Sequence, residues 1–187
     1  MAGNIAHLFA HHLGASPERA LYRHHVENAW CDVTAGEVAI LAARWQAAFA
    51  REGFQPGDRI ALCVRNGVTW VAIDLAALGL QLVVVPLYVD GGPDNVAWCA
   101  GNAQARLLIV ENSRIAAALA KVEDPQQPLP PRLVVRPDAG ETAATVAAWL
   151  PAQAPPYAVA DVTPATLATI CYTSGTAGRP KGVMLSH

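Results

Sequence analysis

The stretch of sequence that decides how this chain is organised occupies residues 168–187 and reads ATICYTSGTAGRPKGVMLSH. It starts with a β-rich apolar run and ends with a second one, from Gly182 to Leu185. Between these runs, residues 173–181 contain hydroxyl side chains, glycines, an arginine, a proline and a lysine, which do not build a hydrophobic core. The pattern predicts a polar loop between two strand-like segments.

This loop has the chemistry of a polyphosphate-binding site. Gly175 and Gly178 tolerate positive φ and allow the main chain to approach a ligand closely, so that backbone N–H groups line a concavity. Lys181 adds a point charge suited to phosphate. Each hydrogen bond to a charged oxygen contributes roughly 1.5–3 kcal/mol, so about four or five would hold a triphosphate tail. The candidate phosphate-binding residues are Thr173, Ser174, Gly175, Thr176, Gly178 and Lys181.

The loop differs from a Walker P-loop, because that motif needs G-x-x-x-x-G-K-[ST] between a strand and a helix. It resembles instead the signature of the adenylate-forming superfamily, which includes acyl-CoA synthetases, adenylation modules of peptide synthetases, and luciferases. The usual form there is Tyr-Thr-Ser-Gly-Thr-Thr-Gly-x-Pro-Lys-Gly-Val, and this chain departs from it at Ala177, with the loss of one hydroxyl. The alternative interpretation is a surface hairpin rich in Gly, Ser and Thr with an incidental lysine.

A second stretch supports the same resemblance. Residues 34–88 contain a capped helix, then GFQPGDRIAL at 53–62, and then VVVPLY at 83–88. These segments come in the order and at the distance from the loop that are typical of fatty acyl-CoA synthetases. The resemblance covers most of residues 21–187, and its Pro-Leu-Tyr ending is closer to acyl-CoA synthetases than to peptide-synthetase modules.

The hydrophobic pattern upstream of the loop predicts the fold class. Short, continuous apolar runs at 60–64, 82–87 and 107–110 are separated by helical stretches at 68–80 and 93–103. Strands that are apolar on both faces and alternate with helices are typical of a parallel sheet covered by helices. We therefore expect an α/β fold with a mostly parallel sheet and helices on both faces. The resemblance makes it part of the large N-terminal domain of an acyl-CoA synthetase-like fold.

Local signals predict further elements. Asn4 can cap a first helix, and residues 20–33 indicate a hairpin. Thr34, three residues before a glutamate, opens a capping box for the next helix. Asp74 is an isolated charge in an apolar helix, and we expect it to be solvated or hydrogen-bonded locally. Residues 142–150 predict a weak, alanine-rich helix.

Composition narrows the class of protein. The chain has 187 residues, 53% hydrophobic and 15% charged, which favours a packed core over disorder. Its net charge of −2 argues against a general nucleic-acid binder.

The four cysteines show no C-x-x-C pairing, so buried, reduced thiols are favoured over metal or disulfide roles. Without a signal-peptide pattern or an uninterrupted membrane-length apolar run, the sequence predicts a soluble, cytoplasmic protein.

The resemblance implies a reaction. In that superfamily a carboxylic acid attacks the α-phosphate of ATP, giving acyl-AMP and pyrophosphate, and a thiol, usually that of coenzyme A, then takes the acyl group. It implies ATP, Mg²⁺ and coenzyme A as cofactors, small-molecule partners, and scope for peripheral membrane association through a fatty-acid substrate. The loop would contact the β- and γ-phosphates, Lys181 would neutralise the leaving pyrophosphate, and Arg179 would face solvent.

The resemblance also implies that much of the site lies elsewhere. The superfamily's acidic metal-binding motif, its ribose-binding aspartate, its hinge and the lysine of its small C-terminal domain all follow the phosphate loop. We therefore expect residues 1–187 to be the N-terminal portion of the AMP-binding domain of a protein roughly 500–600 residues long. The portion would hold no catalytic residue and no metal ligand, and would be inactive alone. The alternatives are an adenylation module that feeds a carrier protein, and a non-catalytic interaction or structural fragment.

Overall fold

A mostly parallel sheet forms the centre of the computed structural model, which describes residues 4–122, 128–139, 144–173 and 179–187. The strands lie in the order β6-β5-β3-β4-β7-β8. All neighbouring pairs from β6 to β7 are parallel, and β8 is antiparallel to β7. The predicted α/β class is confirmed. The strands are β3 (Arg59–Cys63), β4 (Val83–Pro86), β5 (Ala105–Asn112), β6 (Arg132–Arg136), β7 (Leu167–Thr173) and β8 (Lys181–Ser186).

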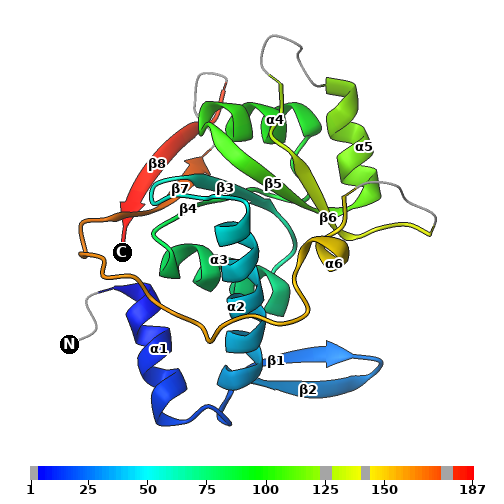
Figure 1. The fold of residues 1–187 in the computed structure, drawn as a ribbon. Coiled ribbons are helices and arrows are strands. Elements are labelled where there is room, and N and C mark those ends of the chain that lie inside the picture. The colour runs from blue at the N-terminus through cyan, green and yellow to red at the C-terminus, as the bar shows by residue number, and fades with distance from the viewer. Residues whose placement is uncertain (1–3, 123–127, 140–143, 174–178) are drawn as a thin grey trace.

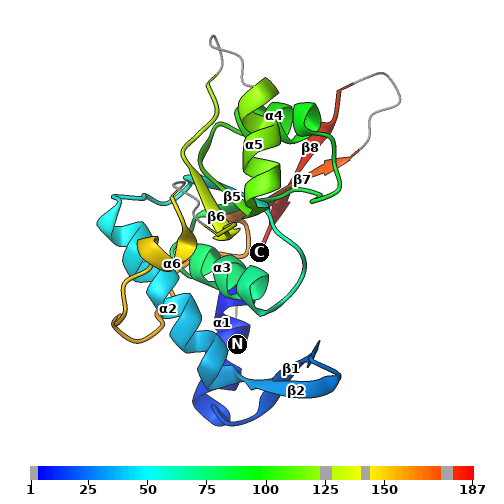
Figure 2. The same cartoon turned by 90° about the vertical axis from the view of Figure 1, so that its right-hand side faces the viewer.

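Helices cover both faces of this sheet (Figures 1 and 2). Along β3, Ile60 and Leu62 enter one core while Ala61 and Cys63 enter the other, because successive side chains of a strand point to opposite faces. No helix in the described part of the chain is both long and apolar enough to cross a membrane. The face of the sheet with Ile60 and Leu62 is covered by α1 (Ile5–Ala15), α2 (Ala35–Arg51), α3 (Val68–Gly79) and α6 (Val146–Trp149). The face with Ala61 and Cys63 is covered by α4 (Pro93–Asn102) and α5 (Ser113–Val122).

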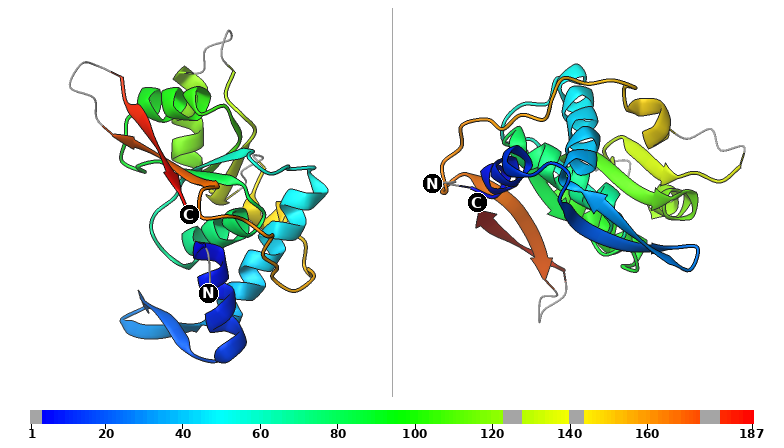
Figure 3. Two further views of the ribbon diagram at one scale, coloured as in Figure 1. Left: turned by 90° about the vertical axis from the view of Figure 1, so that its left-hand side faces the viewer. Right: turned by 90° about the horizontal axis from the view of Figure 1, so that it is seen from below.

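The predicted N-terminal hairpin is present as a separate two-stranded antiparallel ribbon of β1 (Ala20–Val26) and β2 (Ala29–Thr34). Its turn residues Glu27 and Asn28 have φ of 46° and 67°. Two consecutive left-handed residues match the twist of the flanking strands and are typical of tight hairpins. Figure 3 shows the ribbon lying apart from the main sheet, at the α1 and α2 end of the molecule.

The predicted helix starts are confirmed, but one predicted helix is too long. Asn4 Oδ1 accepts a hydrogen bond from the backbone N–H of His7 at 2.8 Å, and Thr34 forms the expected capping box. The prediction of a helix over 142–150 is wrong in extent, and its first two residues lie outside the described part. Thr145 is extended, bridges to Val134 of β6 and caps the helix, so that only Val146–Trp149 is helical.

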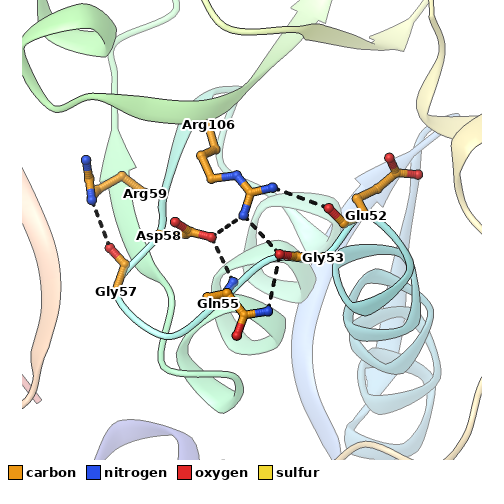
Figure 4. Close-up of polar contacts among 7 residues, drawn as sticks. All are labelled: Glu52, Gly53, Gln55, Gly57, Asp58, Arg59 and Arg106. Carbon is orange, nitrogen blue, oxygen red and sulfur yellow. Dashed lines mark hydrogen bonds and ion pairs between the residues drawn. The ribbon is translucent and has the colours of Figure 1, made fainter.

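The turn between α2 and β3 is tied to the start of β5 (Figure 4). The Asp58 carboxylate accepts a hydrogen bond from the backbone N–H of Gln55 at 2.7 Å and another from the Arg106 guanidinium. Arg106 also donates to the carbonyl oxygens of Gly53 at 3.1 Å and Glu52 at 3.3 Å. Asp58 therefore closes the turn before β3 and binds Arg106, which connects this turn to the neighbouring parallel strand β5.

We predict that Asp58→Ala lowers the free energy of unfolding by about 1–2 kcal/mol, because it removes a charged hydrogen bond and a turn contact together. Urea unfolding measures this change. Asp32→Ala is the matched control, because Asp32 pairs with Arg23 on the surface, where ion pairs contribute little. Equal losses for the two variants would contradict the special role of Asp58.

Asp74 of α3 departs from the prediction that it is solvated or locally hydrogen-bonded. The residue is partly buried, and desolvation raises its pKa from an ordinary 3.8 to about 6. Burial, and secondarily the charge of Asp74, raises the pKa of both Tyr22 and Tyr157. Among the described residues, none donates a hydrogen bond to the Asp74 carboxylate in this structure. The ionised side chain therefore destabilises the fold.

We predict that Asp74→Asn stabilises the chain in a pH-dependent way. The folded state binds this proton more tightly than the unfolded state, so the penalty is absent below about pH 4 and complete above about pH 6. At pH 7.5 the variant should gain on the order of 1–3 kcal/mol in the free energy of unfolding. Urea unfolding at pH 4.5 and pH 7.5 measures the difference, and an equal gain at both values would refute the explanation.

Candidate functional site

The candidate site lies where β7 leaves the sheet. Ligands of open α/β sheets bind outside the carboxyl ends of the strands, and β7 ends at Thr173. Thr173 and Lys181 face each other as the last cross-strand pair of the β7–β8 hairpin, and both are exposed. The structure thus brings together two of the predicted residues that are eight positions apart. The other predicted residues lie outside the described part: Ser174, Gly175, Thr176 and Gly178.

A cleft of about 400 Å³ opens beside Thr173. It lies between the exit of β4, helix α4 and the β7–β8 hairpin, and its walls combine apolar side chains with a few polar groups. Such a mixture is typical of small-molecule sites. The sequence analysis missed the contribution of α4, because no local pattern indicates that a helix lines a cleft beside a loop far away in the sequence. The lining residues are Pro86, Leu87, Tyr88, Asn95, Val96, Cys99, Tyr172, Thr173 and Pro180.

The thiols near the cleft are not activated nucleophiles. All four cysteines are free; Cys63 and Cys99 are buried, and Cys31 and Cys171 are partly exposed. Burial raises the pKa of both Cys63 and Cys99 to about 11. Because the thiolate is the reactive form, these two thiols are inert near neutral pH. The prediction that the thiols are buried therefore holds for two of the four.

The search for grouped metal ligands covers the described residues alone. Within the parts of the chain that the structure describes, no three His, Cys, Asp or Glu side chains are grouped so that they could hold a metal ion.

The glycine after Lys181 is required by packing. Tyr172 lies directly opposite Gly182 across the hairpin. A Cβ on Gly182 would lie 2.8 Å from Cγ2 of Ile170 and 3.2 Å from Cζ of the Tyr172 ring. An aromatic ring that covers an edge-strand glycine stabilises the strand pair and fixes its register.

Arg179 is exposed, as predicted, but it also has a partner. Its guanidinium carbon lies 4.2 Å from the centre of the Trp98 ring on α4. This cation–π contact joins residues that are far apart in the sequence, and the pattern of neither segment predicts it.

Comparison with known proteins gives the family. The family model described as AMP-binding enzyme matches residues 9–187. The long-chain-fatty-acid–CoA ligase FadD15 of Mycobacterium bovis is 27% identical over 187 residues, covering 98% of this chain and 31% of that protein. Pyochelin synthetase PchE of Pseudomonas aeruginosa is 35% identical over 156 residues, covering 83% of this chain and 9% of that protein.

A solved structure has the same fold. The anthranilate CoA ligase AuaEII, crystallised with anthranoyl-AMP, superposes with a TM-score of 0.82 at 19% identity, over 100% of this chain and 35% of that one. The fold and the family model agree: this chain belongs to the AMP-binding, adenylate-forming enzyme family. Nearly the whole of this chain matches FadD15, but the match spans only about 31% of the length of FadD15.

We predict that Gly182→Ala disturbs the hairpin, because the new methyl group meets Ile170 and a tyrosine ring closer than van der Waals distance. The expected loss is about 1–3 kcal/mol in the free energy of unfolding, measured by thermal or urea denaturation. Gly101→Ala in α4 is the matched control, because an added Cβ would meet nothing within 4 Å apart from its chain neighbours and the backbone of its own helix, and alanine favours a helix. A loss as large in the control would refute the packing explanation.

Proposed function

We propose that this chain is the N-terminal part of an ATP-dependent acyl-CoA synthetase, which activates a carboxylic acid as an acyl adenylate and passes it to coenzyme A. The observation that carries the proposal is the pairing of Thr173 with Lys181 where the β7–β8 hairpin leads into its loop. This pair lies at the carboxyl end of β7, in a chain that belongs to this family. The similarity to FadD15 favours a fatty acid as the substrate class.

In the first step, a carboxylate oxygen of the acid forms a bond to the α-phosphorus of ATP. The bond from that phosphorus to the oxygen bridging to the β-phosphate breaks, and pyrophosphate leaves with the electron pair. In the second step, the thiol of coenzyme A gives its proton to solvent and its sulfur bonds to the acyl carbon. The bond from that carbon to the phosphate oxygen breaks, and AMP leaves with the electron pair. Catalysis of such transfers relies on positioning and on stabilisation of developing charge.

The proposed role of the hairpin is at the leaving group. Lys181 would neutralise the charge that accumulates on pyrophosphate, since an ammonium group serves as a mobile point charge for phosphate. Hydroxyls and backbone N–H groups would hold the β- and γ-phosphates, and Thr173 stands opposite Lys181 at the start of this set. The full set that we propose is Thr173, Ser174, Gly175, Thr176, Gly178 and Lys181.

The proposed domain organisation follows from the lengths of the relatives. Because the chain covers 31% of FadD15, we propose that residues 1–187 are an incomplete portion of the AMP-binding domain. The rest of that domain and the small C-terminal domain would complete the site for the acid and the thiol. The portion alone is then expected to bind a nucleotide polyphosphate without forming an adenylate.

A second candidate function is an adenylation module that feeds a carrier protein. The higher identity to PchE, 35% over 156 residues, favours it. The two functions share the adenylation step and differ in the thiol that accepts the acyl group. Acyl-CoA formed by the complete parent protein would support the first candidate, and transfer to a phosphopantetheinyl carrier domain would support the second.

We predict that Lys181→Ala weakens the binding of ATP to this chain by about ten- to a hundredfold, the equivalent of one charged hydrogen bond. Isothermal titration calorimetry measures the affinity. Lys121→Ala is the matched control, because it removes the same charge from the last turn of α5. ATP binding that is equal in the wild type and in Lys181→Ala would overturn the proposed role of the loop.

A further inference from the structure

Helix α4 contacts both flanks of the candidate phosphate loop. On the β7 side, the hydroxyl of Tyr172 donates a hydrogen bond to Oδ1 of Asn102 at 2.6 Å. On the β8 side, Nε1 of Trp98 donates to the carbonyl oxygen of Pro180 at 3.4 Å, and the Trp98 ring underlies Arg179. Figures 1 and 2 both show α4 next to the ends of β7 and β8 that lead into the loop.

The hairpin needs this support because the sheet holds it only near its base. The register between β4 and β7 consists of one pair in the described residues, Val84 with Thr169. Tyr172 and Thr173 lie three and four positions further along β7. On its other side β7 pairs with β8, an edge strand that is exposed along its whole length. The end of the hairpin that carries Lys181 therefore extends past the paired part of the sheet, toward α4.

The contacts on the β7 side lead directly to Lys181. Asn102 holds the hydroxyl of Tyr172, and the Tyr172 ring covers Gly182, the residue after Lys181. Because the Tyr172 ring is held at its hydroxyl and packs with its face on Gly182, it restricts the position of β8 relative to β7. On the other side of the loop, Trp98 holds the two residues that precede Lys181. Lys181 is thus fixed through the residues on both sides of it.

Of the side chains in these contacts, Tyr172 packs against the hydrophobic core on the α4 side of the sheet, and the others lie outside that core. Asn102 and Arg179 are exposed, and Trp98 is partly exposed, whereas the core side of α4 is formed by residues such as Val96 and Ala100. Truncation of Asn102 or Trp98 should therefore leave the fold in place and change mainly the position of the hairpin.

We infer that α4 is the support that positions the phosphate-binding hairpin, with Trp98 and Asn102 as positioning residues for Lys181. The inference rests on the proposed function, because it assigns these residues to the same ATP-binding loop. As positioning residues, neither has to contact the nucleotide. Each acts through the main chain or the ring that it holds.

The experiment compares Trp98→Ala and Asn102→Ala with the wild-type chain by two readouts. Hydrogen–deuterium exchange should rise several-fold in peptides that cover residues 179–187 and stay unchanged in those that cover β3 and β5. The dissociation constant for ATP should rise about three- to tenfold, the size expected for one cation–π contact or one hydrogen bond. Trp98→Phe keeps a ring under Arg179, so it should restore most of the affinity.

Two further variants sharpen the test. Arg179→Ala combined with Trp98→Ala should weaken ATP binding no more than Trp98→Ala alone, because both remove the same contact. Arg51→Ala is the matched control: Arg51 also stacks on a tryptophan, Trp149, at 5.5 Å, but it lies on α2, away from the hairpin. It should change neither the exchange of residues 179–187 nor the affinity for ATP.

The outcomes separate the inference from the function on which it rests. Unchanged exchange in the hairpin, or a uniform rise throughout the chain, overturns the positioning role of α4. Faster exchange in the hairpin with unchanged affinity for ATP overturns it too, because the support would then be irrelevant to binding. If the wild type fails to bind ATP, or Lys181→Ala binds it equally well, the proposed function fails, and with it the link from α4 to ATP.

Discussion

The packing of the Tyr172 ring on Gly182 is the contact on which the candidate site depends. Side chains alternate along a strand, so a slip of one residue in the β7–β8 register would move Lys181 to the opposite face of the hairpin. The ring and the glycine prevent such a slip, because a Cβ at this position would lie 3.2 Å from the ring. The same register places Thr173 opposite Lys181. Packing next to the loop therefore determines where the charge of the loop lies.

The burial of the sheet on both faces explains why the candidate site lies at the carboxyl ends of its strands. Core side chains occupy both sides of β3, so a ligand cannot lie against either face of the sheet centre. The carboxyl ends of β4 and β7 are different, because the chain turns away there and leaves a cleft of about 400 Å³. Polar backbone groups at strand ends are free to meet a ligand, whereas those inside the sheet are already paired.

The sequence predicted those features whose cause is local. The capping box of Thr34 and Glu37 satisfies two backbone groups within four residues, and the structure shows both hydrogen bonds. The continuous apolar runs of β3, β4 and β5 have few alternatives to a buried parallel strand. The family signature at residues 172–183 is equally local, and the family match confirms the resemblance that it suggested.

The sequence did not predict features that depend on distant partners. The start of α6 is shifted because Thr145 bridges to β6, which no pattern around residue 145 reveals. The sequence predicts that Asp74 is solvated or hydrogen-bonded locally, but the tyrosines beside it come from segments about 50 and 80 residues away along the chain. The Tyr172–Asn102 bond likewise spans 70 residues. Such contacts are properties of the packed molecule, and composition and periodicity carry no record of them.

The two parts of the candidate site share one helix face. Asn95, Trp98, Cys99 and Asn102 follow the i, i+3, i+4, i+7 spacing that places residues on a single stripe of α4. Asn95 and Cys99 line the cleft, while Trp98 and Asn102 hold the hairpin. A ligand group in the cleft would thus contact the same stripe that fixes the loop. The cleft and the hairpin therefore rest on one face of the same helix.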